Sequence, residues 1–189
     1  MISAWVVEDW VERTSDDMTF TGSLTQCTDD DYLKEYGWDT DKFGWDCLAG
    51  WSCDYLTSNH GQCEMHEDLR DAGRLFTGMM IITMFDLIMW LQVVVHGIFN
   101  VDYGIPVLNY AYITHACVVY VTAVLGWFDR SEASFDADCG EDTTSRFVPA
   151  VCATTGPAIA IFTIFPFLIT TLLFYKVYYM RDISNVEAP

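Results

Sequence analysis

Basic residues are scarce in this chain of 189 residues. Nine lysines and arginines stand against 27 aspartates and glutamates, which gives a formal net charge of −18. This balance argues against a nucleic-acid-binding protein, which needs lysine and arginine to replace the counterions of phosphate groups. It also argues against a matrix-targeting leader, because such leaders are rich in arginine and poor in acids, whereas residues 1–17 are the reverse. Aromatic residues, at 15% of the chain, exclude intrinsic disorder.

Motifs for catalysis, glycosylation and secretion are also missing. The chain has no nucleophile–base constellation, P-loop, dinucleotide-binding fingerprint or zinc-protease motif, so we expect no enzymatic activity. No Asn-x-Ser/Thr sequon occurs, and N-glycosylation is therefore not expected. Residues 1–14 lack the basic start and the apolar core of a signal peptide. We therefore expect that the first membrane span acts as a reverse anchor, or that a signal or a further helix precedes Met1.

Long apolar runs, in contrast, are abundant. Hydrophobic residues make up 52% of the chain and concentrate in three windows, 75–99, 105–128 and 156–175. The first window holds one charged residue, Asp86, and the other two hold none. Each matches the roughly 20 residues that cross a hydrocarbon core, where backbone groups need the internal hydrogen bonds of a helix. The sequence predicts an all-α membrane protein with a bundle of three transmembrane helices, at 75–99, 105–128 and 156–180.

These helices divide the rest of the chain between two sides of the membrane. One side holds an acidic, cysteine-rich segment, 1–74, and an outer loop, 129–155; the other holds a short turn, 100–104, and a tail, 181–189. All but four of the 27 acidic residues belong to the first side. The acidity therefore marks one face of a membrane protein, which would attract cations or a basic partner.

Six of the seven cysteines lie on that acidic side: Cys27, Cys47, Cys53, Cys63, Cys139 and Cys152. An even number of cysteines in acidic, loop-rich sequence is typical of disulfides in an oxidising compartment, here up to three with the pairing left open. A zinc site is disfavoured, because the spacing lacks the short CxxC pairs of zinc ribbons. Arginines near the spans favour the opposite orientation by the positive-inside rule. We give the cysteines more weight and expect an extracellular or lumenal N-terminus and a C-terminus on the cytoplasmic or stromal side.

Asp86 is the one acidic residue within a predicted span. An acid in mid-membrane costs about 2.5–3.5 kcal/mol on insertion scales and is usually paired. A proton or cation pathway is one use of such a group, but no second intramembrane charge completes a relay. We therefore expect a hydrogen bond from the next span, with Thr114, His115 or Asn109 as its source.

His96 and His115 are the other polar candidates within the spans. Antiparallel helices could bring the two to similar depth. Two histidines without further carboxylates or thiolates make a weak metal site, so interhelical hydrogen bonding is the favoured use. We expect no cofactor beyond lipid, and contact of these histidines with haem or a pigment stays an open alternative.

The stretch before the first span carries a family resemblance. Gly50, Trp51 and Cys53 are followed by Cys63 and then by Arg74 at the entry to the span. This pattern resembles the first outer loop of the claudin, PMP22 and calcium-channel γ-subunit tetraspan superfamily. The resemblance implies a β-containing outer region pinned by a Cys53–Cys63 disulfide, and a left-handed bundle of four helices. The family's first helix is not in this sequence, so the resemblance implies a helix before Met1 or one supplied by a partner chain.

The function that we predict is structural. We expect a non-catalytic accessory subunit of a larger membrane assembly, of claudin/PMP22-like or channel-accessory type, with other membrane subunits and lipid as partners and no nucleic acid. The alternative is a transport, electron-transfer or pigment-contacting small subunit of a bioenergetic or photosynthetic complex, acting through Asp86 or through His96 and His115. A light-harvesting family with three spans is excluded, because its third span needs a Glu and an Arg and this one has neither.

Overall fold

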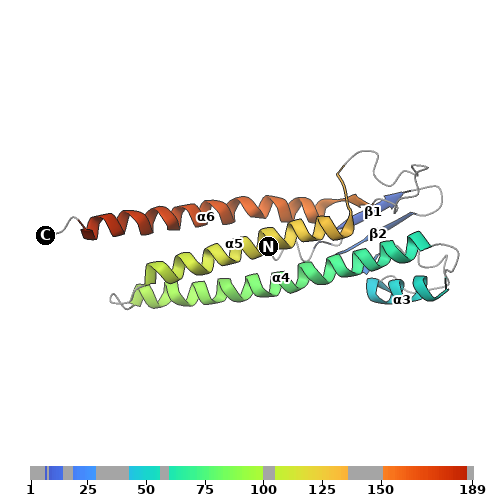
Figure 1. Ribbon diagram of the computed structural model, residues 1–189, viewed down its shortest axis with the longest axis horizontal. Coiled ribbons are helices and arrows are strands. Elements are labelled where there is room, and N and C mark those ends of the chain that lie inside the picture. Colours follow the sequence, from blue (N-terminus) through green and yellow to red (C-terminus); the bar gives the residue numbers. More distant parts are fainter. Residues whose placement is uncertain are drawn as a thin grey trace. The chain divides into compact units, whose positions relative to one another are not determined.

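Three long helices dominate the computed structural model, which describes residues 7, 9–14, 19–28, 43–55, 60–99, 105–135 and 151–186. The helices are α4 (His60–Phe99), α5 (Ile105–Ser131) and α6 (Thr155–Val186) (Figure 1). All three contain a stretch long and apolar enough to cross a membrane: Cys63–His96, Leu108–Ser131 and Thr155–Lys176. The prediction of three candidate membrane-spanning helices is confirmed.

Helix α4 begins at His60, well before the apolar window at Leu75. Residues 60–74 contain no proline and several strong helix formers, so the helix continues through them. The ion pair between Arg70 and Glu67, at 3.5 Å between nitrogen and oxygen, joins residues one helical turn apart. This first part carries six acidic or basic side chains, whereas residues 75–99 carry one, Asp86.

Helix α5 ends in a left-handed cap. Glu132, directly after the last helical residue, has a φ of 51°, and its backbone N–H donates to the oxygen of Phe128 at 3.1 Å. The N–H of Ala133 then donates to Oγ of Ser131 at 3.3 Å. The first of these bonds pairs one of the backbone carbonyls near the end of α5, where the last carbonyls of a helix otherwise lack partners.

A five-stranded sheet accounts for much of the remaining described chain. Its strands are β1 (Val11–Thr14), β2 (Thr19–Gly22), β3 (Gln26–Cys27), β4 (Phe43–Gly44) and β5 (Cys152–Ala153). They lie in the order β4-β3-β2-β1-β5, and each strand runs antiparallel to the strands beside it. Helix α3 (Trp45–Tyr55) follows β4 directly. The prediction of a small β-containing region is confirmed.

Strand β5 comes from the segment between α5 and α6, whereas the other four strands precede α3. Val11 pairs with Ala153 and Glu12 with Cys152. The two segments that the sequence assigned to the acidic side, 1–74 and 129–155, therefore contribute to one sheet.

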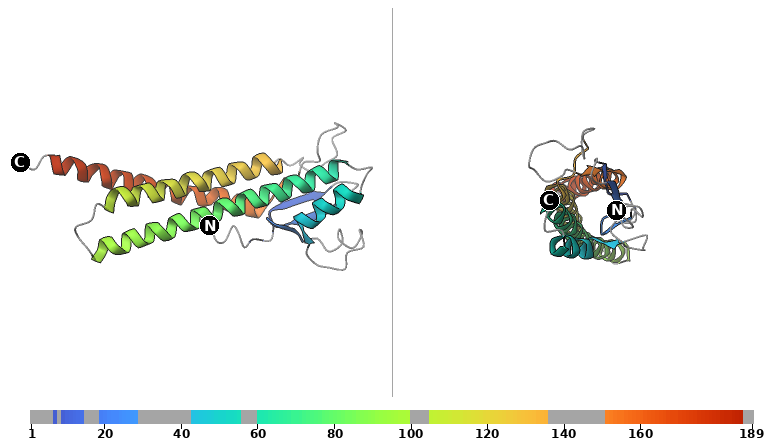
Figure 2. Two further views of the ribbon diagram at one scale, coloured as in Figure 1. Left: turned by 60° about the horizontal axis from the view of Figure 1, so that its bottom comes forward. Right: turned by 90° about the vertical axis from the view of Figure 1, so that its right-hand side faces the viewer.

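The chain divides into two compact units. The sheet unit comprises Met1–Phe76 and Val124–Ile161, and the helix unit comprises Thr77–Ala123 and Phe162–Pro189. The sheet unit contains the sheet, α3 and the ends of the long helices that connect to them (Figure 2). The helix unit contains the apolar parts of α4, α5 and α6.

Two aromatic pairs join α6 to α5 and to α4 in the helix unit. Tyr120 of α5 stacks on Phe167 of α6 with 5.3 Å between ring centroids, and Trp90 of α4 meets Phe174 of α6 edge-on at 5.7 Å. Helix α5 has the largest buried share of the three candidate spans. Its small buried residues Ala116 and Ala123 permit close helix approach.

Candidate functional site

Trp10 is the structural centre of the sheet unit. Its indole is 1% exposed and meets the ring of Phe76 in α4 at 4.8 Å and that of Trp127 in α5 at 5.1 Å, both edge-on. Such aromatic pairs contribute about 0.5–1.5 kcal/mol each beyond the area they bury. One tryptophan beside β1 therefore joins the sheet to two of the long helices.

The backbone around Trp10 continues this connection to α6. The N–H of Trp10 donates to the oxygen of Gly22 in β2 at 2.8 Å, and its own carbonyl accepts from the N–H of Thr154 at 3.1 Å. The N–H of Gly156, in the first turn of α6, donates to the oxygen of Asp9 at 2.8 Å. The sheet and the start of α6 are thus linked by hydrogen bonds as well as by packing.

A second aromatic cluster holds α3 and α4 against the sheet. Trp45 donates from Nε1 to the oxygen of Ser23 at 3.1 Å, and its ring stacks on His66 of α4 at 6.0 Å. Phe20 of β2 meets both rings, at 5.9 Å and 6.5 Å. Gly73 of α4 lies so close to the carbonyl of Leu24 that no side chain fits there. These contacts fix the first part of α4 on the sheet.

Burial changes the titration of His66, which lies in the charged first part of α4, outside the apolar window. Removal of the imidazole from water lowers the pKa of His66 from 6.5 to about 4, because the charged form loses its solvation. Near neutral pH the ring is therefore uncharged. Its neighbour Asp68 has a raised pKa, first because of burial and then because of the negative charges of Glu132 and Glu64.

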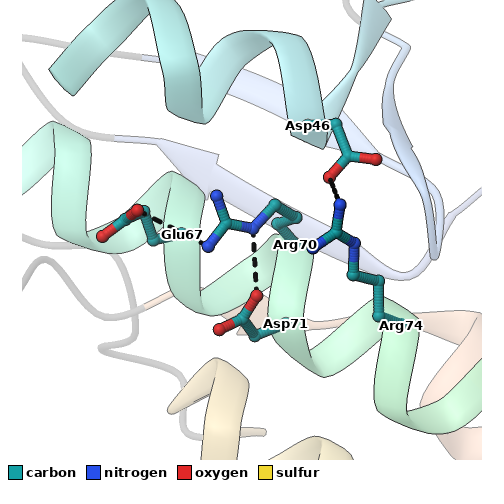
Figure 3. Close-up of polar contacts among 5 residues, drawn as sticks. All are labelled: Asp46, Glu67, Arg70, Asp71 and Arg74. Atoms are coloured by element: carbon teal, nitrogen blue, oxygen red, sulfur yellow. Dashed lines mark hydrogen bonds and ion pairs between the residues drawn. The ribbon is translucent and has the colours of Figure 1, made fainter. Parts of the chain in front are cut away.

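The ion pairs of this region lie on its surface. Arg74 donates from Nη2 to Oδ1 of Asp46 in α3 at 2.7 Å, while Arg70 binds Asp71 at 2.9 Å within α4 (Figure 3). Arg74 is the basic residue of the sequence motif, so the structure gives it a contact between α3 and α4. The Arg74 and Asp46 side chains are 64% and 59% exposed, and a pair of this exposure is worth under about 1 kcal/mol.

The acidic-side cysteines whose side chains the structure describes fall into two groups. Cys47 is an exposed free thiol, and Cys27 is a buried thiol whose Sγ donates to the oxygen of Thr21 at 3.5 Å. Neither therefore forms the disulfide for which the cysteine count made it a candidate. Cys63 and Cys152 do not carry free thiols.

The remaining motif residues are only partly described. Gly50, Trp51 and Cys53 belong to α3, and a Cβ added at Gly50 would meet nothing within 4 Å. The side chains of Trp51 and Cys53 and the whole of Cys139 lie outside the described residues.

Asp86 and His115 form a pair in the helix unit. Nδ1 of His115 in α5 lies 2.7 Å from Oδ2 of Asp86 in α4. The carboxylate is buried, with 9% of the side chain exposed, whereas the imidazole is 60% exposed. Of the three partners that the sequence offered for Asp86, His115 makes the contact. Asn109 is buried, and its Oδ1 has no hydrogen-bond partner among the described residues.

His96 is separate from this pair. Its Nδ1 bonds to the oxygen of Gln92 in its own helix at 2.9 Å. The contact between Asp86 and His115 sets the register of the antiparallel helices, and His96 lies ten residues beyond Asp86, about 15 Å along the helix. The expectation that the two histidines share one depth is therefore wrong. Among the described residues, no group of three His, Cys, Asp or Glu side chains is placed to hold a metal ion.

Comparison with known proteins adds no relative. No family model, curated protein or solved structure matches the chain.

Proposed function

We propose that this chain is a non-catalytic subunit of a larger membrane assembly, and that its sheet unit is an extracellular or lumenal interaction module. The observation that carries the proposal is the pairing of β1 with β5 at Val11↔Ala153 and Glu12↔Cys152. It joins two segments separated by two candidate membrane spans into one folded surface. A chain that only anchored itself in lipid would have no need of such a module.

The apolar surface of the three helices supports the same proposal. Large hydrophobic side chains remain exposed on each candidate span, including Phe85 in α4, Leu125 in α5 and Leu172 in α6. Lipid covers such surfaces in isolated membrane proteins, and neighbouring helices cover them in complexes. We propose that membrane helices of other subunits pack on part of this surface.

A claudin/PMP22-like relationship is part of the proposal. The antiparallel sheet supports it, because the resemblance implies a β-containing first outer region. Arg74 supports it through its contact with α3, the helix that carries Gly50, Trp51 and Cys53. We further propose disulfides that pair Cys53 with Cys63 and Cys139 with Cys152, which fits the lack of free thiols at Cys63 and Cys152. Each would stabilise the module by about 2–4 kcal/mol.

Two substitutions distinguish this function from the transport or redox alternative. Asp86→Asn and His115→Ala are introduced into the full chain in its own membranes, and both the native size of the complex and its activity are measured. A structural role predicts that the variants reduce the assembled fraction, because the Asp86–His115 contact joins α4 to α5. Full assembly of both variants would overturn the structural role of this contact, whether or not ion flux or an optical signal is lost.

A further inference from the structure

The pair formed by Asp86 and His115 leaves one ring nitrogen unused. A carboxylate only accepts hydrogen bonds, so Nδ1 of His115 donates to Oδ2 of Asp86 across 2.7 Å. In the neutral imidazole the other nitrogen, Nε2, then carries a lone pair. Within the part of the chain that the structure describes, no hydrogen bond reaches Nε2. The His115 side chain as a whole is 60% exposed.

The surroundings of His115 are apolar. Ala111 and Val118, one turn away on either side along α5, are exposed, as is Ile82, one turn from Asp86 on α4. Polar groups within membrane spans generally face the bundle interior and are paired. Lipid tails offer no partner to Nε2, so an imidazole in this position indicates a ligand that is itself largely apolar and binds a nitrogen lone pair.

The metal-binding side chains available near His115 limit the kind of ligand that it could bind. A bare metal ion needs several protein ligands, and the described residues offer no group of three that could hold one. A metal enclosed in a tetrapyrrole already has four nitrogen ligands and needs only one axial ligand. Histidine is a common axial ligand to haem iron. Ligating histidines typically donate their other ring N–H to a carboxylate, as His115 does to Asp86.

We propose that His115 is the axial ligand of a metallotetrapyrrole, a haem or a magnesium chlorin, bound on the apolar surface beside Ala111, Val118 and Ile82. Asp86 is the positioning residue, because it fixes the tautomer and the orientation of the ring. The bond forms by donation of the Nε2 lone pair into the open axial position of the metal. No proton is released and no electron is transferred. This site does not depend on the structural role proposed above.

The test uses the purified full chain in detergent micelles, titrated separately with ferric haem and with chlorophyll a. Saturable binding of one macrocycle per chain, with a shift of its main absorption band, is expected for one of the two. His115→Ala should weaken this binding at least about tenfold, and His115→Gly should regain the bound spectrum when free imidazole is added. His96→Ala is the matched control, since His96 is also an exposed histidine of a candidate span, and should bind like the wild type.

Asp86→Asn separates positioning from folding. We expect about 10–100-fold weaker binding and a lower metal–histidine stretching frequency, because an amide is a poorer acceptor for Nδ1–H. Circular dichroism and gel filtration confirm that each variant is folded. Binding to haem alone or to the chlorin alone identifies the ligand. Absence of saturable binding by the folded wild type, or equal binding by folded His115→Ala, would overturn the proposal.

Discussion

The indole of Trp10 lies directly against Gly156 at the start of α6. A Cβ added to residue 156 would lie 2.6 Å from both Cδ1 and Nε1 of Trp10. The absence of a side chain at Gly156 therefore leaves room at the start of α6 for the Trp10 indole, which also packs against Phe76 and Trp127.

Gly156→Ala should therefore destabilise the sheet unit. The added methyl group forces Trp10 to move, and overpacking of this kind costs about 1–3 kcal/mol. Thermal unfolding in detergent and limited proteolysis measure the loss. Gly50→Ala is the matched control, because Gly50 is exposed in α3 with open space around its Cβ position and should gain about 0.5–1 kcal/mol. Equal stability of the two variants would show that the Trp10–Gly156 contact is not tight.

Acid should destabilise the sheet unit through His66. The folded-state pKa of His66, about 4, is below its ordinary value of 6.5, so the unfolded chain binds a proton more readily. Stability from the neutral ring is complete above pH 6.5 and falls as the pH drops toward 4, by about 3 kcal/mol in all.

His66→Phe tests this dependence, because phenylalanine keeps a ring against Trp45 and cannot titrate. Unfolding midpoints at pH 7 and pH 4.5 should differ less in the variant than in the wild type. Asp68 acts in the opposite direction, since its raised pKa favours the folded state as pH falls. Parallel losses in the variant and the wild type would contradict the assignment to His66.

The three long apolar helices could be predicted, because runs of this length with at most one charged residue allow few alternatives. Residues 75–99 mark the apolar part of α4, but its start at His60 could not be predicted from hydropathy, since residues 60–74 are polar and helical. The pairing of β1 with β5 also escaped prediction, because β5 has two residues and no alternating pattern.

Some residues of the candidate sites could likewise be predicted from the sequence, and others could not. Asp86 stands out as the one acid within the apolar window 75–99, and its partner is among three candidates on the next candidate span. Trp10, Gly156 and His66 gave no sequence signal, because each depends on contacts between residues far apart in the chain. The depth of His96 relative to His115 could not be predicted, because the register of α4 against α5 follows from the contact of Asp86 with His115.

The thiols report the orientation of the sheet unit. Cys47 is exposed and free, so a membrane-impermeant maleimide should label it from the extracellular or lumenal side of sealed membranes without reductant. Cys27, buried in the sheet, should react only after unfolding. Cys47→Ser should abolish the native signal. Labelling of Cys47 only after the membranes are opened from the cytoplasmic side would reverse the proposed topology.

Arg74→Ala should change stability by less than about 1 kcal/mol, because the Arg74–Asp46 pair is well exposed to solvent. The Asp46→Ala variant and the double variant complete a thermodynamic cycle, which isolates the coupling of the two charges. The coupling should decrease in high salt. A coupling of several kcal/mol that salt leaves unchanged would mean that the pair is shielded from water by another part of the assembly.

Photo-crosslinking in intact native membranes tests the central claim, assembly with other membrane subunits, most directly. A photoreactive amino acid replaces, one at a time, the exposed residues Phe85, Leu125 and Leu172, with the buried Tyr120 as the control position. At least one exposed position should yield a single protein adduct of defined mass, and position 120 should yield none. If all three exposed positions yield only lipid adducts and the extracted chain has the mass of one subunit, the chain is not part of an assembly and the account is contradicted.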